Sequence, residues 1–317
     1  MRQTMRIFVS VASYCDPVLP FTLERAVATA ADASRLHFGV VDQSPEGSPR
    51  VRAPGRARLS QVRVDARDAR GPCWARALAM SLQDAEDWFL QLDSHMDFDP
   101  GWDDTLVAQA LALGAPRRPV VISTYPDAFS LVDGQPVRRP TTGGVLAQVL
   151  KPDAAFAPDH PVLSFQAQPV EGTQPLPAFH VGAGCLFAPG RIVQEVPYDP
   201  WLYFHGEEQA MALRLYTQGW DLFHMPALPV HHLYNDAASG APPRPLHWDA
   251  EHEAQREVPW WAFEQRARAR LAALVAGVDL GVYGIGRVRS VADFAAFSGI
   301  DYAARTLAPS AFVPRAA

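Results

Sequence analysis

The chain has 317 residues, of which 48% are apolar and 20% are charged, and its formal net charge is −6. A globular protein of this length can bury one large core or two modest ones. The negative balance and the near absence of lysine argue against a protein that binds nucleic acid.

The first half of the chain alternates apolar runs with helical patterns, which predicts an α/β fold with a mostly parallel sheet flanked by helices. Strand patterns occupy these residues: 6–13, 36–43, 62–67, 88–92 and 119–126. Helical patterns occupy 19–32, 73–85 and 102–114, and in the second of these Trp74, Leu78 and Leu82 are expected to share one apolar stripe.

The second half begins with a stretch rich in Pro and Gly, residues 127–178, in which short strand patterns predict a hairpin-rich insert. A helix is expected at 206–219, a strand at 221–226 and a charged helix at 260–277. We predict one catalytic domain over residues 1–240 and a helical extension over 241–317 packed on it.

The N-terminus is read as a first strand and not as a signal peptide, because its apolar run is short and Tyr14, Cys15 and Asp16 follow instead of a cleavage site. No apolar run approaches the ~18 residues of a membrane span. The three cysteines lack a C-x-x-C spacing, which indicates neither a disulfide framework nor a thiolate zinc site. A cytoplasmic protein is therefore expected.

The strand expected at 88–92 runs directly into Asp93, Ser94 and His95. Because side chains alternate along an extended chain, Asp93 and His95 point the same way and can share one cation. A carboxylate and a neutral imidazole suit Mn²⁺ and related divalent ions, which can neutralise a diphosphate. The alternative is an exposed polar loop in which His95 caps the strand.

A histidine late in the chain could complete a site with three ligands. His231 and His232 are adjacent, and neighbouring residues of a strand face opposite ways, so only one of them is expected to take part. The alternative is that both are structural.

Two further stretches could lie against a substrate. Glu207 and Glu208 open a helix after Gly206; the helix dipole explains one acid there, and the other could accept hydrogen bonds from sugar hydroxyls. The stretch VGAGC, residues 181–185, offers glycine backbone that a ligand can approach closely. No G-x-S-x-G, H-E-x-x-H or P-loop motif occurs.

These stretches resemble one family when they are taken in order. ARGPCWARALAMSL, DWFLQLDSHMDFDPGWDDTLV, AGCLF, FHGEEQAMALRLYTQGWDLFHMP, HHLYN and YGIGRVRSVADFAAFSGIDY are similar to the UDP-GlcNAc:hydroxyproline N-acetylglucosaminyltransferases, which include the enzyme that modifies the ubiquitin-ligase subunit Skp1. The resemblance covers most of residues 5–302. A remoter resemblance reaches the polypeptide N-acetylgalactosaminyltransferases, although His205 stands where those enzymes have glycine.

The resemblance implies the GT-A nucleotide-sugar fold, a divalent cation (typically Mn²⁺, with Mg²⁺ as the alternative) and retention of anomeric configuration. It also implies a role for each matching residue. Asp93, His95 and His232 hold the metal, and Asp93 and Glu207 are the expected catalytic residues, with Glu207 near the donor sugar and Ala183 and Gly184 beneath it. Ser13, Tyr14 and Asp16 surround uridine, and Arg76 and Ser94 also bind the UDP-sugar.

The expected activity is transfer of GlcNAc from UDP-GlcNAc to a hydroxyl of a protein, a peptide or a small molecule. The Ala- and Arg-rich composition is typical of a GC-rich bacterial source, where the acceptor need not be a hydroxyproline protein. UDP-glucose or UDP-galactose as donor, a silent sugar-nucleotide-binding protein and a metal-dependent hydrolase remain alternatives. The insert and the segment after Tyr234 are expected to shape the acceptor groove.

Overall fold

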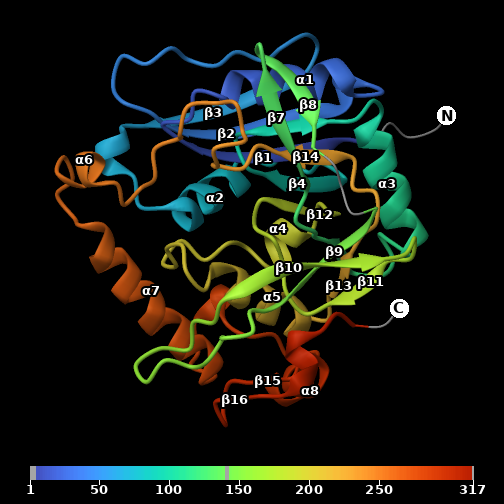
Figure 1. Cartoon of the computed structure of the whole chain (residues 1–317), viewed down its shortest axis with the longest axis vertical. Helices are drawn as coiled ribbons and strands as arrows, with labels where there is room; N and C mark the ends of the chain where they lie inside the picture. The colour runs from blue at the N-terminus through green and yellow to red at the C-terminus, as the bar shows by residue number, and fades with distance from the viewer. Residues whose placement is uncertain (1–4, 140–142, 316–317) are drawn as a thin grey trace.

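An eight-stranded sheet runs through the protein, which is described here from a computed structural model covering residues 5–139 and 143–315 (Figure 1). Its strands lie side by side in this order: β11 (Leu176–Ala178), β13 (Asp221–His224), β6 (Val120–Ile122), β12 (Cys185–Pro189), β4 (Trp88–Leu92), β1 (Ile7–Tyr14), β2 (Leu36–Gln43) and β3 (Arg58–Val64). All pairings are parallel except those of β12 with its two neighbours and of β11 with β13. The predicted mostly parallel sheet is confirmed.

The helices cover both faces of this sheet. The α-helices are α1 (Leu19–Thr29), α2 (Pro72–Met80), α3 (Trp102–Ala112), α4 (Ile192–Glu195), α5 (Glu207–Thr217), α6 (Ala250–Glu253), α7 (Trp260–Val275) and α8 (Val291–Ser298). The described residues also form four short 3₁₀ helices: η1 (Ala33–Arg35), η2 (Ala66–Asp68), η3 (Gly281–Tyr283) and η4 (Pro309–Phe312).

Alternate residues of β1 enter different cores, which explains why the strand reads as a continuous apolar run. Val9 packs in the same core cluster as Leu23 of α1 and Trp102 of α3. Its neighbour Phe8 packs in a second cluster, which also holds Met211 of α5. A strand buried on both faces can only lie in the interior of the sheet, and β1 does.

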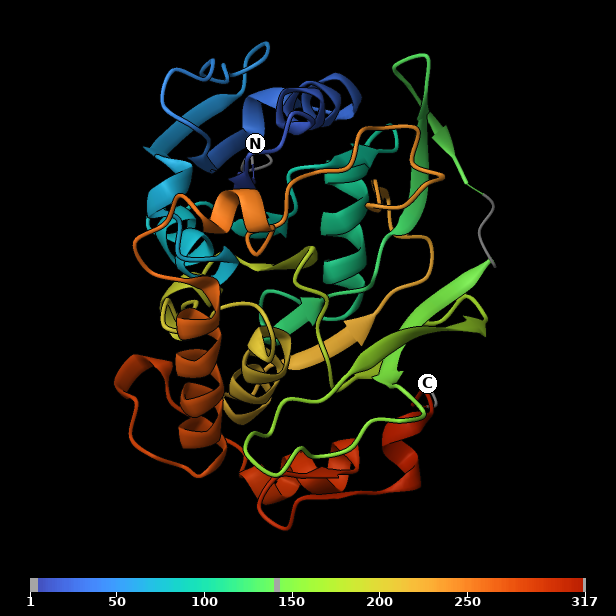
Figure 2. The same cartoon turned by 60° about the vertical axis from the view of Figure 1, so that its left-hand side comes forward.

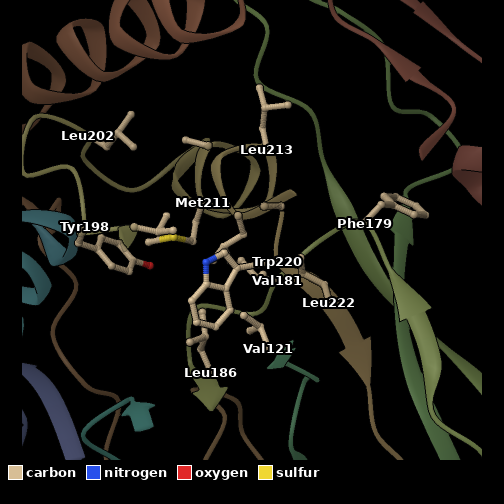
Figure 3. Close-up of a cluster of buried hydrophobic side chains, with 14 of the residues drawn as sticks. Val121, Phe179, Val181, Leu186, Tyr198, Leu202, Met211, Leu213, Trp220 and Leu222 are labelled. Atoms are coloured by element: carbon tan, nitrogen blue, oxygen red, sulfur yellow. The ribbon is translucent and has the colours of Figure 1, made fainter. Parts of the chain in front are cut away.

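Trp220 lies at the centre of this second cluster (Figure 3). Its ring is fully buried, among side chains that include Val121, Met211 and Leu222. The indole N–H still finds a partner, because it donates to Glu195 Oε2 at 3.1 Å. The cluster thus joins the sheet, α5 and the loop that precedes β13.

A smaller sheet stands beside the end of β4, in the order β5 (Met96–Phe98), β14 (Val230–His232), β7 (Asp127–Val132) and β8 (Gln135–Arg138). The expected hairpins of the insert are β7 with β8 and β9 (Gly144–Leu150) with β10 (Phe165–Glu171), both antiparallel. Residues 1–4, at the start of the N-terminal segment, and residues 140–142, within the insert, lie outside the described residues.

The C-terminal residues lie at the opposite end of the molecule from the N-terminal strands, coloured red and blue in Figure 2. They include a short hairpin of β15 (Ile300–Asp301) and β16 (Thr306–Leu307). Leu271 of α7 and Phe294 of α8 belong to the same core cluster as Trp220. The division into two domains at residue 240 stays a prediction. No helix among the described residues combines the length and the apolarity needed to cross a membrane.

The apolar stripe expected on α2 is wrong in its detail. The helix ends at Met80, so Leu82 lies beyond it, and Trp74 and Leu78 are only half-buried. The buried face carries Cys73 and Arg76 instead. Apolar periodicity predicted the wrong face of the helix because it does not count arginine as a buried residue, whereas Arg76 is only 5% exposed.

Candidate functional site

The candidate site lies at the carboxyl ends of β1 and β4, which are parallel neighbours in the main sheet. From β1 the chain moves to β2 on one side, whereas β4 lies on the other side. A reversal of strand order of this kind opens a crevice in which ligands of α/β proteins bind. Asp16 follows β1, and Asp93, Ser94 and His95 follow β4, so these side chains meet at the crevice.

Asp93, His95 and His232 form a cluster in which one ligand atom from each lies within 4.8 Å of the others. His232 Nε2 is 3.3 Å from Asp93 Oδ2, and the two imidazole centroids are 4.7 Å apart. Pairing of β14 with β5 sets His232 opposite Met96. This register brings a residue from late in the chain next to the end of β4.

A carboxylate orients His95 from outside the cluster. Nδ1 of His95 lies 2.7 Å from Asp16 Oδ2, and Ser94 Oγ donates to the same oxygen at 2.6 Å. The backbone N–H of Val18 donates to the other oxygen of Asp16 at 2.8 Å. The other ring nitrogen of His95, Nε2, is thereby left for the cluster, as in metal sites where a carboxylate fixes the histidine tautomer.

The donor set fits a divalent cation. Burial lowers the pKa of His232, so its imidazole is neutral and can act as a ligand. Burial alone would raise the pKa of Asp93, but the hydrogen bond with His232 and the charge of Arg76 hold it below its ordinary value. One carboxylate and two imidazoles suit Mn²⁺ and related ions.

Arg76 connects the cluster to α5. Its guanidinium donates to Asp93 Oδ1 at 3.0 Å and to Glu207 Oε1 at 2.6 Å, and the Cys73 thiol donates to Glu207 Oε2 at 2.7 Å. Burial raises the pKa of Glu207, and the charge of Arg76 opposes this shift. Glu207 was expected at the donor sugar, yet it lies inside this network and does not line the cavity.

Glycine backbone lies directly against the cluster. A Cβ on Gly184 would come within 2.5 Å of Asp93 Oδ2, so only glycine fits there without a shift. The backbone N–H of Asp93 donates to the Gly184 carbonyl at 3.2 Å. Ala183 N–H donates to Glu208 Oε1 at 2.8 Å, which links this backbone to α5. The two predicted backbone positions therefore adjoin Asp93.

A cavity of about 320 Å³ opens above the cluster. It is lined by Ala12, Tyr14, Asp16, Pro72, Arg76, Asp93, Ser94, His95, Phe204, His232, Asn235, Arg244, Pro245, Leu246, His247 and Trp248. Phe204 and Trp248 form an aromatic edge pair with their ring centroids 4.9 Å apart.

Arg244, which no sequence pattern singles out, brings a cation to this cavity. It is 7% exposed and donates through NH2 to the Leu233 carbonyl at 2.5 Å, while NH1 has no hydrogen-bond partner among the described residues. Its position in a Pro-rich segment gave no periodic signal. Arg244 lines the cavity, and an anionic ligand there could accept a hydrogen bond from its guanidinium group.

The residues expected around uridine have different environments. Asp16 lines both the main cavity and a neighbouring cavity of about 450 Å³, which Cys15, Asp42 and His252 also line. Tyr14 lines the main cavity, but its hydroxyl lies 2.7 Å from His252 Nδ1 and is held by Arg256. Ser13 is buried and lines neither cavity.

The other polar residues near the strand end serve the smaller sheet. His231 faces away from the cluster, with Nε2 3.0 Å from Asp99 Oδ1. Arg138 binds Asp99 at 2.9 Å and also contacts Asp97, which pairs with Arg25 at 2.6 Å. Of the two adjacent histidines, His232 is the one in the cluster.

Residues 51–304 match the family model described as Glycosyltransferase (GlcNAc). No curated protein matches the sequence significantly. A solved structure of GalNAc-T7 with UDP, GalNAc and Mn²⁺ is similar at a TM-score of 0.55 and 15% identity, covering 92% of this chain and 55% of that one. A solved structure of S. aureus TarS, residues 1–349, matches at a TM-score of 0.41 and 12% identity, covering 69% of this chain and 60% of that one. The chain thus spans little more than half the length of these structures, and the first shares its fold.

Proposed function

The chain belongs to the Glycosyltransferase (GlcNAc) family and has a GT-A fold, and we propose that it transfers GlcNAc from UDP-GlcNAc to a hydroxyl group of an acceptor with retention of anomeric configuration. The observation that carries this proposal is the cluster of Asp93, His95 and His232 at the strand-order reversal of the sheet. A silent binding protein would not need that arrangement of ligands, nor a separate carboxylate to orient one of them.

Different parts of the UDP-GlcNAc donor occupy the two cavities. The diphosphate lies at the cluster, where Arg244 NH1 can donate to a phosphate oxygen. The uracil ring enters the neighbouring cavity beside Asp16 and Asp42. The sugar rests on the backbone of Ala183 and Gly184, which carries no bulky side chain.

The metal ligands are Asp93, His95 and His232, and Mn²⁺ or Mg²⁺ is the expected ion. Such an ion, when bound, supplies positive charge that stabilises the departing diphosphate. The similar structure of GalNAc-T7 was solved with UDP and Mn²⁺, which supports this assignment. Arg76 keeps Asp93 ionised and oriented, and Glu207 holds Arg76 in place. Glu207 is thus a positioning residue in this proposal.

The transfer forms a bond between the acceptor oxygen and the anomeric carbon, while the bond from that carbon to the β-phosphate oxygen breaks. The acceptor approaches on the face from which UDP leaves, and its hydroxyl proton passes to the departing phosphate oxygen. No protein base is required in this scheme. The phosphate contacts of Arg244 offset the negative charge that develops on UDP.

Release of UDP from UDP-GlcNAc tests the proposal. The protein should release UDP slowly without acceptor and faster with a hydroxylated acceptor, and chelation of divalent cations should stop both reactions. UDP-GalNAc, UDP-glucose and UDP-galactose, measured in parallel, identify the donor. Metal-independent release, or release that no hydroxylated acceptor stimulates, would count against a transferase.

A further inference from the structure

A third pocket adjoins the proposed donor site and is not explained by UDP-GlcNAc binding. Its volume is about 370 Å³, and its walls include Tyr125, Lys151, Phe165, His180 and Glu208. Phe204 lines both this pocket and the main cavity. Most of the wall therefore comes from the hairpin-rich insert and from the start of α5.

His180 is a buried imidazole without a hydrogen-bond partner. It is 1% exposed and stacks on Phe165 with the ring centroids 3.5 Å apart. Neither ring nitrogen has a partner among the described residues; Nε2 lies 3.4 Å from Glu208 Oε2 without hydrogen-bond geometry. Buried polar groups are nearly always satisfied, so an unsatisfied one beside a carboxylate indicates a site that a ligand completes.

Glu208 connects this pocket to the floor beneath the donor sugar. Its Oε1 accepts from Ala183 N–H at 2.8 Å, which leaves Oε2 toward His180. The side chain of Glu208 is 29% exposed, whereas that of Glu207 is 5% exposed. An ionised carboxylate has further acceptor sites, so Oε2 can accept from a ligand hydroxyl next to the sugar.

Lys151 is the only lysine in a chain with 28 basic residues of the Lys and Arg types. It follows β9, is exposed and has no ion-pair partner in the part of the chain that the structure describes. A lysine ammonium is a compact point charge on a flexible stem, so Lys151 can pair with an anion that enters the pocket. The pocket thus has a hydroxyl acceptor at one side and a free cation in its wall.

We propose that this pocket is the acceptor subsite and that it selects acceptors in which a carboxylate or phosphate accompanies the reacting hydroxyl. Lys151 pairs with the anion, and Glu208 orients the hydroxyl toward the donor sugar. His180 holds Glu208 in position once the acceptor is bound. The inference rests on the proposed transferase activity, because only a transferase needs an acceptor.

The single lysine provides the probe for the test. Reductive methylation with ¹³C-formaldehyde keeps its charge and gives one lysine side-chain signal. With UDP and Mg²⁺ present, this signal is followed during titration with matched neutral and anionic compounds: methyl β-glucoside and methyl β-glucuronide, glycerol and glycerol 3-phosphate, and a serine tripeptide with and without a neighbouring aspartate. The matched pairs distinguish the sources of the anion.

A saturable shift with the anionic member of a pair, and none with its neutral partner, is the expected result. No saturable shift with any anionic compound would overturn the inference. UDP binding is measured in a separate titration. Failure to bind UDP would contradict the proposed donor site and not the acceptor pocket, so the two failures are distinguishable. In steady-state assays, Lys151→Gln should lower kcat/KM for the anionic acceptor about tenfold through KM, and Lys151→Arg should retain most of it. Equal loss for neutral and anionic acceptors would also overturn it.

Discussion

Nδ1 of His95 lies 2.7 Å from the carboxylate of Asp16, although the two residues are 79 positions apart in the chain. A second carboxylate, Asp99, lies 3.0 Å from His231, the histidine that faces away from the cluster. These two carboxylate–histidine pairs are similar in geometry, and of the two only His95–Asp16 contacts the proposed metal site.

Replacement of Asp16 by asparagine should weaken Mn²⁺ binding about 10- to 100-fold, because His95 loses the carboxylate that fixes its tautomer. Asp99→Asn is the matched control and should leave the affinity within about twofold, since His231 is not a ligand. Calorimetric titration with Mn²⁺ measures both. Equal Mn²⁺ affinities in the two variants would show that Asp16 does not support metal binding.

Glu207→Gln should lower the free energy of unfolding by about 3 kcal/mol, because it removes one partner of a buried ion pair and leaves Arg76 less compensated. Glu208→Gln, one residue along the same helix, should change it by less than about 1 kcal/mol, since that side chain is partly exposed. Urea unfolding monitored by circular dichroism gives both values. A larger loss at Glu208 would contradict the assigned network.

Acid should destabilise the protein through His224. Burial lowers the pKa of this histidine from 6.5 to about 4, while Nδ1 lies 2.5 Å from the Ser123 carbonyl and Gln148 N–H donates to Nε2. Because the pKa is lower in the folded protein, the unfolded chain binds a proton at higher pH than the folded chain does. The stabilisation that depends on neutral His224 is therefore fully present above pH 6.5 and is lost as the pH falls toward about 4.

Between these two pH values, His224 should make the free energy of unfolding fall by about 1.4 kcal/mol for each pH unit of acidification. His224→Gln keeps a polar side chain without the titration, so its unfolding free energy should depend less steeply on pH by this amount. Urea unfolding at several pH values measures the difference between the variant and the parent protein. Identical slopes would show that His224 is not kept neutral by burial.

Trp220→Ala should destabilise the fold by about 3–5 kcal/mol, because the cavity it leaves in the core cluster cannot close completely. Trp261→Ala is the matched control. That ring is 57% exposed, so its removal should change the free energy of unfolding by no more than about 0.5 kcal/mol. Thermal or urea unfolding compares them. Similar losses at both positions would contradict the core assignment.

The pairing of Asp93 with His95 could be predicted from sequence, because both follow directly after a buried apolar run. The expected extended alternation is wrong, because β4 ends at Leu92 and Ser94 and His95 form a bend before β5, yet the bend still brings both side chains to the cluster. Adjacency of His231 and His232 likewise shows that only one can face the cluster. Which one does depends on the register of β14 against β5, which sequence periodicity does not report.

The contacts across the sheet could not be predicted in this way. Asp16 reaches His95 because β1 and β4 are parallel neighbours, a pairing between distant segments. Arg76 is buried because Asp93 and Glu207 neutralise it, and neither partner lies on its own helix. Burial of a charged residue depends on its partners, so hydropathy alone placed the stripe of α2 on the wrong residues.

Calorimetric titration of the protein with UDP-GlcNAc, with and without Mn²⁺, tests the central claim most directly. His232→Ala is compared with His231→Ala, its neighbour outside the cluster. Binding should require Mn²⁺, survive in His231→Ala and be lost in His232→Ala. Binding that is equally tight without the metal, or that both substitutions weaken alike, would contradict it.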